Sequence, residues 1–162
     1  MRKLFKYLLV LSPTLLGFIY GQIKSLYSLT YSTCYLISLI ILVYWCLVGF
    51  YFSKTSKHCF MLTLGSNIVG IVSFTIICLD FFAGLEFSPM LKEWAGYFTL
   101  PMNAFTQYID LSFSIGNLSI SGEISKYIIG FILMLLSFAF GCFIRKTFMA
   151  TKKITKRAKR KK

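Results

Sequence analysis

Acidic side chains are scarce in this sequence. Its 162 residues hold five Asp and Glu against 18 Lys and Arg, and charged residues make up only 14% of the chain. Soluble domains carry about 25% charged residues, because they need polar surface to cover a hydrophobic interior. A chain of this size that is 57% hydrophobic has too few polar side chains for that. The composition therefore excludes an ordinary soluble domain and favours a membrane protein.

Residues that carry catalysis or bind metals are also scarce. His58 is the one histidine, and the sequence shows no Ser–His–Asp or Cys–His set and no glycine loop for phosphate. The cysteines match no metal-site spacing, and we expect free thiols that pack as small apolar residues. They are Cys34, Cys46, Cys59, Cys78 and Cys142. We therefore predict no enzyme activity, no metal and no cofactor.

Four apolar runs dominate the chain. They cover residues of about 7–23, 33–52, 59–82 and 127–144. The hydrocarbon core of a bilayer is about 30 Å thick and takes about 20 helical residues to cross. The runs predict an all-α membrane protein with four transmembrane helices. A long structured outer loop, residues 83–123, is expected between helices 3 and 4.

The first run has two interpretations. It follows the basic start "MRKLFK", which also fits a signal peptide, but no small-x-small cleavage site follows, so we prefer an uncleaved helix. Pro13 predicts a kink, and either neighbouring helices or Ser12 would satisfy the carbonyl that proline leaves without a donor. Gly17 and Gly21 form a G-x-x-x-G pair, which suits close packing against another helix of the chain or a second copy.

The charges are divided between two parts of the chain. The acids all lie within residues 80–123, where Lys92 is the single basic residue. Lys and Arg collect on the cytoplasmic side of membrane proteins. With four crossings, the basic amino end, the 53–58 link and the tail share one face, so we predict that both termini are cytoplasmic. The 24–32 link and the outer loop then face outside, and the Lys-, Ile- and Phe-rich composition suggests a bacterial plasma membrane.

The last residues form a polybasic cytoplasmic tail. We divide the chain into a transmembrane domain, residues 1–144, and this tail, residues 145–162. Each Lys or Arg near an anionic membrane surface contributes about 1 kcal/mol of attraction. The residues expected to contact anionic lipid head groups are Arg145, Lys146, Lys152, Lys153, Lys156 and Arg157. Nucleic acid is the less favoured partner, because no aromatic residue follows Phe148 to stack on bases.

The outer loop is rich in aromatic and apolar residues and should have structure of its own. Ser88 followed by Pro89 is a helix-start pattern, and a second short helix is expected after Pro101. The alternation in "LSFSIGNLSISG" predicts a strand or hairpin. We interpret the loop as a lid of short helices lying on the outer leaflet, and the alternative is a binding surface for an external partner.

Two stripes of small and polar residues are expected on helix faces. With about 100° per residue, the third helix carries the first stripe: Thr63, Ser66, Asn67, Gly70, Ser73 and Asp80. The fourth helix carries the second: Lys126, Gly130, Ser137 and Gly141. Small residues let helices approach closely, so we predict that the stripes face each other and that Asp80 pairs with Lys126. The alternative is a polar substrate path along the third helix.

The layout resembles small uncharacterised four-helix integral membrane proteins of low-GC Gram-positive bacteria. The resemblance lies in the four spans, the aromatic loop with "FTLPMNAF" and the last helix ending "FAFGCFIRK". It implies a fold and no activity. We predict an interaction, accessory, or immunity or stress factor, whose partners are the bilayer, anionic lipid and a membrane protein. The alternative is a small transporter or transporter subunit with a path along Thr63, Asn67 and Ser73.

Overall fold

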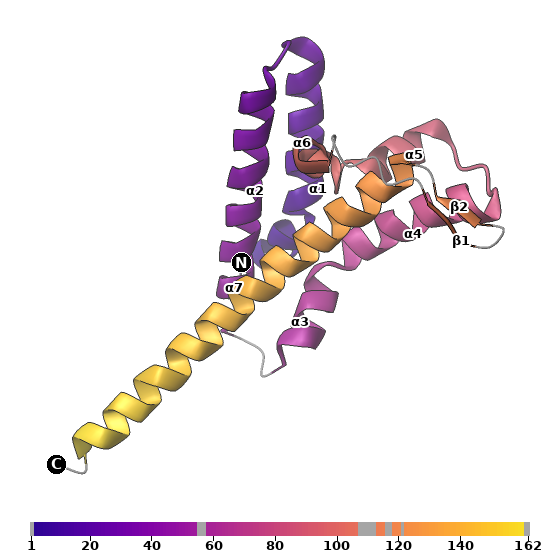
Figure 1. The fold of residues 1–162 in the computed structure, drawn as a ribbon. Helices are drawn as coiled ribbons and strands as arrows, with labels where there is room; N and C mark the ends of the chain where they lie inside the picture. Colours follow the sequence, from indigo (N-terminus) through magenta and orange to yellow (C-terminus); the bar gives the residue numbers. More distant parts are fainter. Residues whose placement is uncertain (1, 55–57, 107–112, 116–117, 121, 161–162) are drawn as a thin grey trace.

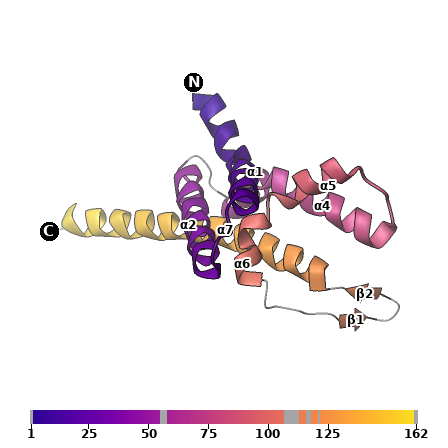
Figure 2. The ribbon, with the colours of Figure 1, turned by 90° about the horizontal axis from the view of Figure 1, so that it is seen from above.

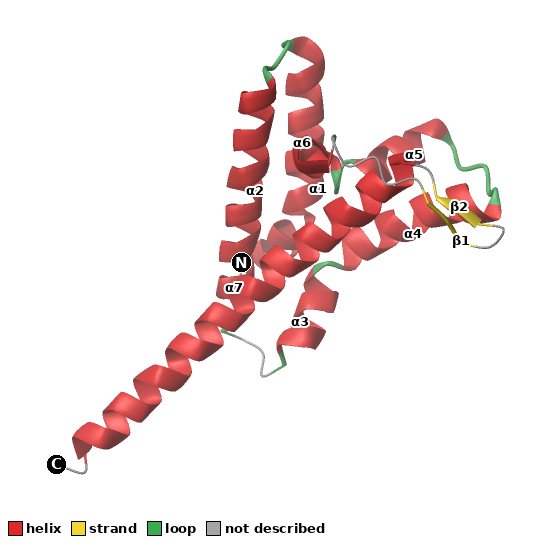
Figure 3. Cartoon of the chain, viewed as in Figure 1, coloured by secondary structure: helices red, strands yellow, loops and turns green. Residues whose placement is uncertain are grey.

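The computed structural model describes residues 2–54, 58–106, 113–115, 118–120 and 122–160. The fold is predominantly helical, with one short strand pair (Figures 1 and 3). The helices are α1 (Arg2–Leu26), α2 (Tyr31–Phe52), α3 (Cys59–Ser66), α4 (Ile68–Ala83), α5 (Pro89–Gly96), the 3-10 turn η1 (Leu100–Met102), α6 (Asn103–Thr106) and α7 (Gly122–Arg160). The strands are β1 (Phe113–Ile115) and β2 (Leu118–Ile120).

Three helices are long and apolar enough to cross a membrane. Their apolar stretches are Leu4–Leu26, Tyr31–Phe52 and Ile124–Met149. In the most apolar part of each, no more than 33% is buried inside the protein. Such exposed apolar surface is consistent with a membrane location, because lipid covers it where water would not.

Helices α1 and α2 form an antiparallel hairpin (Figure 1). As predicted, the Ser12 hydroxyl donates to the carbonyl of Leu9, four residues before Pro13, which leaves that carbonyl without its usual donor. Helix α1 therefore continues through the proline. The Thr30 side chain accepts from the amide of Thr33 and begins α2. Farther along α2, the Tyr44 hydroxyl donates to Ser12 and joins the two helices.

The prediction of one continuous third span, residues 59–82, is wrong. The chain forms two helices, α3 and α4, which are bent by 62° at Asn67 (Figure 3). The backbone of Asn67 leaves the helical region, with φ −102° and ψ 18°. Its side-chain amide donates to the carbonyl of Thr63, and its side-chain oxygen accepts from the indole of Trp45 on α2. These hydrogen bonds hold the bend in place. The apolar run in the sequence does not show them, because it does not indicate which residue Asn67 contacts. Together α3 and α4 supply a fourth crossing if they form one span.

Helix α7 is a single helix of 39 residues. At 1.5 Å per residue it is about 58 Å long, so it extends well past a hydrocarbon core of about 30 Å. The polybasic segment therefore continues the last span as a helix through Arg160. The stretch of α7 that is apolar enough to cross a membrane runs from Ile124 to Met149, which includes the predicted span 127–144.

Two residues of the stripe on α7, Ser137 and Gly141, pack against α2 and not against the third helix as predicted. The Ser137 hydroxyl donates to the carbonyl of Leu42 at 2.6 Å. A β-carbon on Gly141 would collide with the backbone of Cys46, and one on Gly49 would collide with the backbone of Phe138. Because glycine allows two backbones to touch, these positions bring α2 and α7 together more closely than larger side chains would.

The elements predicted within the outer loop are present. Ser88 accepts from the amide of Leu91, and Pro89 takes the first helical position of α5. The second short helix begins around Pro101 as η1 and continues as α6. Strands β1 and β2 pair antiparallel, with Phe113 opposite Ile120.

One part of this predicted loop enters the helix bundle instead of covering it as a lid. The segment Ala95–Thr106, here called the wedge, enters the helix bundle. Its Phe98 and Met102 side chains are 1% and 0% exposed and join the core formed by α2 and α7. In the view from above, α6 lies beside α2 and the first turns of α7 (Figure 2). The bundle admits the wedge because glycines on α1, α4 and α7 leave room for it.

Candidate functional site

The wedge is held against α1 and α2 by close backbone contacts. The G-x-x-x-G pair of α1 packs inside the chain: a β-carbon on Gly17 would collide with the carbonyl of Tyr97, and one on Gly21 would lie 3.0 Å from Leu100 Cδ2. From α2, the Ser38 hydroxyl donates to the carbonyl of Pro101. These contacts fix the position of the wedge and, with it, of α5.

Helix α2 also holds the end of the wedge near its own first turn. The Tyr31 hydroxyl donates to the carbonyl of Ala104 at 3.0 Å. The rings of Tyr35 and Phe105 meet edge to face, with centroids 4.5 Å apart. The wedge is therefore attached at both of its ends, and the loop it belongs to is preorganised.

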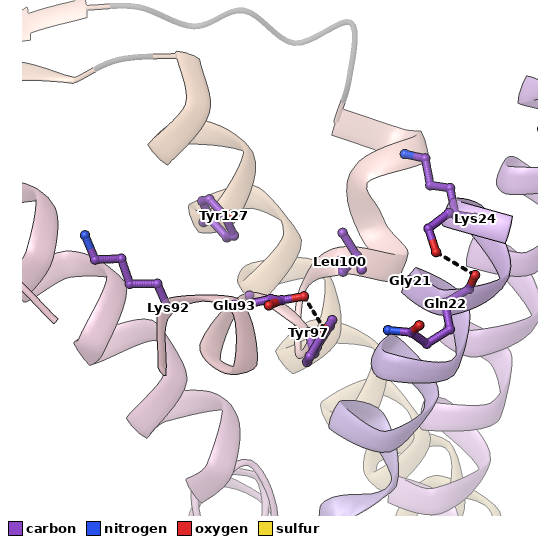
Figure 4. A pocket seen from close by; sticks show the side chains of 10 residues that line it. Gly21, Gln22, Lys24, Lys92, Glu93, Tyr97, Leu100 and Tyr127 are labelled. Carbon is purple, nitrogen blue, oxygen red and sulfur yellow. Dashed lines mark hydrogen bonds between the residues drawn. The ribbon is translucent and has the colours of Figure 1, made fainter. Parts of the chain in front are cut away.

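A polar cleft opens where α1, α5 and α7 meet (Figure 4). Its volume is about 540 Å³. The lining combines glycine and apolar or aromatic residues with two ammonium groups, one carboxylate, one amide and three hydroxyls. The lining residues are Gly21, Gln22, Lys24, Ser25, Lys92, Glu93, Gly96, Tyr97, Leu100 and Tyr127. We call this the outer cleft.

Charged groups in the outer cleft are held by specific partners. Lys92 Nζ lies 2.6 Å from the carboxylate of Asp80 on α4, so the predicted pair of Asp80 with Lys126 is wrong. The reason is the turn after α4: Gly84 adopts φ 62°, which ends the helix and lets α5 return alongside it. Lys24 and Lys92 lie on opposite sides of Glu93 (Figure 4).

Tyr97 and Glu93 form the central contact of the outer cleft. The Tyr97 hydroxyl donates to the Glu93 carboxylate at 2.5 Å. This hydrogen bond to Glu93 raises the pKa of Tyr97, while a hydrogen bond with Gln22 acts in the opposite direction. At neutral pH Tyr97 is therefore protonated, and it orients the carboxylate without neutralising it.

The residues of the predicted stripe on the third helix have separate environments. Thr63 donates to the carbonyl of Cys59, and Asn67 is fully buried with the two partners described above. Ser66 and Ser73 are both buried, and Ser73 is one of two buried hydroxyls, with Thr14, that have no hydrogen-bond partner among the described residues.

The glycines of the two stripes contact the wedge. A β-carbon on Gly70 would collide with the ring of Phe98. One on Gly130 would lie 3.2 Å from Met102 Cβ and 3.3 Å from Thr99 Cβ. The two stripes are thus bridged by the wedge at these positions instead of facing each other directly.

The residues predicted to contact anionic lipid fall into two groups. Arg145 is engaged within the protein: its Nη1 donates to the carbonyl of Phe50 at 3.2 Å, and its guanidinium lies 5.0 Å from the centroid of the Phe50 ring. This contact satisfies a carbonyl at the end of α2. Lys146 also lies in α7. The side chains of the other four, Lys152, Lys153, Lys156 and Arg157, lie outside the described residues.

Two further hollows offer less chemistry than the outer cleft. One, of about 660 Å³ between α2 and α7, is lined by apolar residues and Ser137, whose hydroxyl is already bound to Leu42. The other, of about 430 Å³, lies between α1, the end of α2 and α3, and Lys6 is its charged lining residue. Neither brings together charged groups of both signs, as the outer cleft does.

No family model, no curated protein and no solved structure matches this chain. The function is therefore argued from the geometry of the chain itself. Within the part of the chain that the structure describes, no group of three His, Cys, Asp or Glu side chains is placed to hold a metal ion.

Sequence reasoning missed the outer cleft. Lys92 was noted as a lone base among acids, and Lys24 as part of an outer link, but nothing joined them to Tyr97 or Tyr127. The signal that points to the cleft is the G-x-x-x-G pair together with the aromatic loop. Paired glycines need a partner that approaches closely, and here that partner comes from the loop.

Proposed function

We propose that this chain is a multi-pass protein of a bacterial plasma membrane that works by binding at its outer face. In this role it is an interaction, accessory, or immunity or stress factor, with a small ligand or a membrane protein as partner. We assign it a binding role and no catalytic step. The observation that carries the proposal is the outer cleft, which the wedge builds in advance by fixing α5 against α1 and α7.

The proposed topology has four crossings, with α3 and α4 counted as one broken span. It is supported by the three long apolar helices and by the distribution of charge. The amino end, Lys54 and the polybasic end of α7 then share the cytoplasmic face, as the excess of Lys and Arg on that side requires. The outer cleft lies on the opposite face, at the end of α1 and the start of α7.

A pull-down in mild detergent tests the binding role. The wild-type chain and a cleft variant, Lys92→Gln with Glu93→Gln, are compared with Glu86→Gln, which lies on the same outer loop but does not line the cleft. We expect one set of partners with the wild type and Glu86→Gln and loss of that set with the cleft variant. Equal recovery by all three chains would contradict a role for the cleft.

A small transporter is the second candidate, because broken helices form substrate and ion sites in many transporters. The bend at Asn67 is the observation that favours it. Both polar groups of the Asn67 side chain are, however, engaged with Trp45 and Thr63, and the residue is 0% exposed. A transport phenotype lost in Asn67→Leu with Trp45→Phe, in a chain that still folds and is recovered in wild-type amounts, would favour a carrier over a binding protein.

A further inference from the structure

We propose that the outer cleft binds the headgroup of a phospholipid that carries both a phosphate and a primary amine. This inference rests on the proposed function, since it names the ligand of the same cleft. It uses the size of the cleft, the arrangement of its charges and the apolar surface below it.

The size of the cleft suits a headgroup. Binding sites for small molecules have volumes of about 300–1,000 Å³, and the outer cleft has about 540 Å³. Its floor contains Gly21, Gly96 and Leu100, which carry no charge and leave room for a ligand. The polar groups stand around this floor, as expected for a site in which a few polar contacts set orientation.

The basic groups of the cleft suit a phosphate. Lys24 and Lys92 lie on opposite sides of the cleft (Figure 4). Lys92 is paired with Asp80, whereas no carboxylate of the described residues lies within ion-pair distance of the Lys24 ammonium group. Lysine binds phosphate as a point charge, and one phosphate between the two lysines would give Lys24 the anion it lacks.

Glu93 suits the primary amine of the same headgroup. It lies between the two lysines, and its Oε1 accepts from the Tyr97 hydroxyl. A carboxylate has about four acceptor positions, so one bond from tyrosine leaves capacity for the donors of an ammonium group. A headgroup with no amine would leave Glu93 facing the phosphate without compensation. The cleft therefore favours a zwitterion over a simple anion.

The apolar surface of α1 beside the cleft favours a lipid over free phosphoethanolamine. Phe18 lies one turn of α1 before Gln22, and it packs edge to face on Tyr97 with ring centroids 5.3 Å apart. It is 45% exposed, so an acyl chain leaving the cleft would run over an apolar ring toward the middle of α1. Free phosphoethanolamine shares the headgroup chemistry but makes no use of this surface.

Native mass spectrometry of the full-length protein in detergent tests the proposal. The probes are dihexanoyl phosphatidylethanolamine, the matching phosphatidylcholine and phosphatidylglycerol, and free phosphoethanolamine. We expect the phosphatidylethanolamine to bind about tenfold more tightly than the other three, since it alone combines a phosphate, an ammonium group with N–H donors for Glu93, and acyl chains. Equal binding of all the lipids, or of free phosphoethanolamine, would overturn the inference.

Four variants assign the binding to the cleft. Lys24→Gln should weaken binding of phosphatidylethanolamine about tenfold, and Glu93→Gln should remove its preference over phosphatidylglycerol. The matched controls are Lys126→Gln and Glu86→Gln, which carry the same changes outside the cleft and should bind as the wild type does. Cleft variants that behave like their controls would overturn the inference.

The inference and the proposed function fail in different ways. The lipid measurement is made in detergent and does not depend on how the chain is oriented in the cell. A reporter that places Lys92 in the cytoplasm would overturn the proposed outer-face function and leave the lipid result unchanged. If the reporter places Lys92 outside the cell and the protein shows no preference among the lipids, this inference fails and the proposed outer-face function is unaffected.

Discussion

The middle of α2 and the wedge differ in burial in the opposite way to what their sequences suggest. Leu36, Ile40 and Leu47 lie in a helix that is apolar enough to span a membrane, yet they are 56%, 58% and 61% exposed. Phe98 and Met102 lie in what the sequence presents as a loop, and they are almost completely buried. In this chain, hydrophobicity does not decide which residues face inward.

A membrane location, with which the three long apolar helices are consistent, explains the difference. Lipid tails are as apolar as leucine, so burying a leucine against another helix yields no hydrophobic gain. Residues that gain from contact with protein are those that form hydrogen bonds or allow close approach. On α2 the inward face accordingly includes Ser38, Trp45 and Gly49 beside apolar residues such as Ile41, while the exposed face is almost entirely apolar. The wedge is buried because it meets glycines and hydrogen-bond partners.

The largest expected effect comes from truncating one aromatic ring in each region. Phe98→Ala should lower the free energy of unfolding by about 3–5 kcal/mol, because it leaves a cavity that the bundle cannot fill. Phe140→Ala, which changes a residue of α7 that is itself 60% exposed, should cost less than about 1 kcal/mol, since lipid or detergent takes the place of the ring. Unfolding in a titration with denaturing detergent measures both. Equal losses of stability in the two variants would contradict the view that Phe98 is buried in protein while Phe140 faces lipid.

A smaller effect is expected at the glycines. Gly17→Ala should cost about 1–3 kcal/mol, because the added methyl collides with the carbonyl of Tyr97. Gly65→Ala is the matched control, since a β-carbon there meets nothing within 4 Å. The control should be neutral or slightly stabilising, because alanine favours helix. Thermal unfolding in detergent decides the order, and a harmless Gly17→Ala would contradict the close contact with the wedge.

Removing the hydrogen bond between Asn67 and Trp45 at the bend should lower the free energy of unfolding by an amount comparable to, or slightly smaller than, that of Gly17→Ala. Asn67→Leu leaves the Trp45 indole without its acceptor in a buried site, at an expected cost of about 1–3 kcal/mol. Adding Trp45→Phe removes the orphaned donor and should recover part of this loss. A double-mutant cycle on detergent stability measures the coupling. Additive losses would show that the contact does not hold the bend.

The smallest effect is expected at the rim. The Asp80–Lys92 pair is partly exposed, with side chains 27% and 44% accessible, so its coupling should be about 0–1 kcal/mol. A double-mutant cycle with Asp80→Asn and Lys92→Gln measures it. The same cycle with Asp80→Asn and Lys126→Gln should show no coupling. Coupling of Asp80 to Lys126 and not to Lys92 would contradict the packing of α5 against α4.

Local features of this fold could be predicted from the sequence, while long-range partners could not. The start of α5 follows from Ser88 and Pro89, and the passage of α1 through Pro13 follows from Ser12, because each effect acts within one turn of helix. The bend at Asn67 depends on Trp45, which lies 22 positions earlier in the chain. A hydropathy pattern reports composition along the chain and contains no record of such a partner.

The candidate site was harder to predict for the same reason. The stripes of small residues were recognised, but a glycine does not specify what it contacts. The nearest neighbours of Gly70 and Gly130 belong to the wedge, which the stripe pattern does not predict. The cleft residues come from α1, α5 and α7, so they form a site only after the wedge is in place.

Accessibility of two methionine positions tests the central claim, that the wedge lies inside the bundle, most directly. Met90 on α5 is 83% exposed and Met102 in the wedge is 0% exposed. Each is changed to cysteine in a chain whose five native cysteines are replaced, and intact cells are treated with a membrane-impermeant maleimide. The account predicts that Met90→Cys reacts at once and that Met102→Cys reacts only after denaturation. Rapid labelling of Met102→Cys in the folded protein would contradict it.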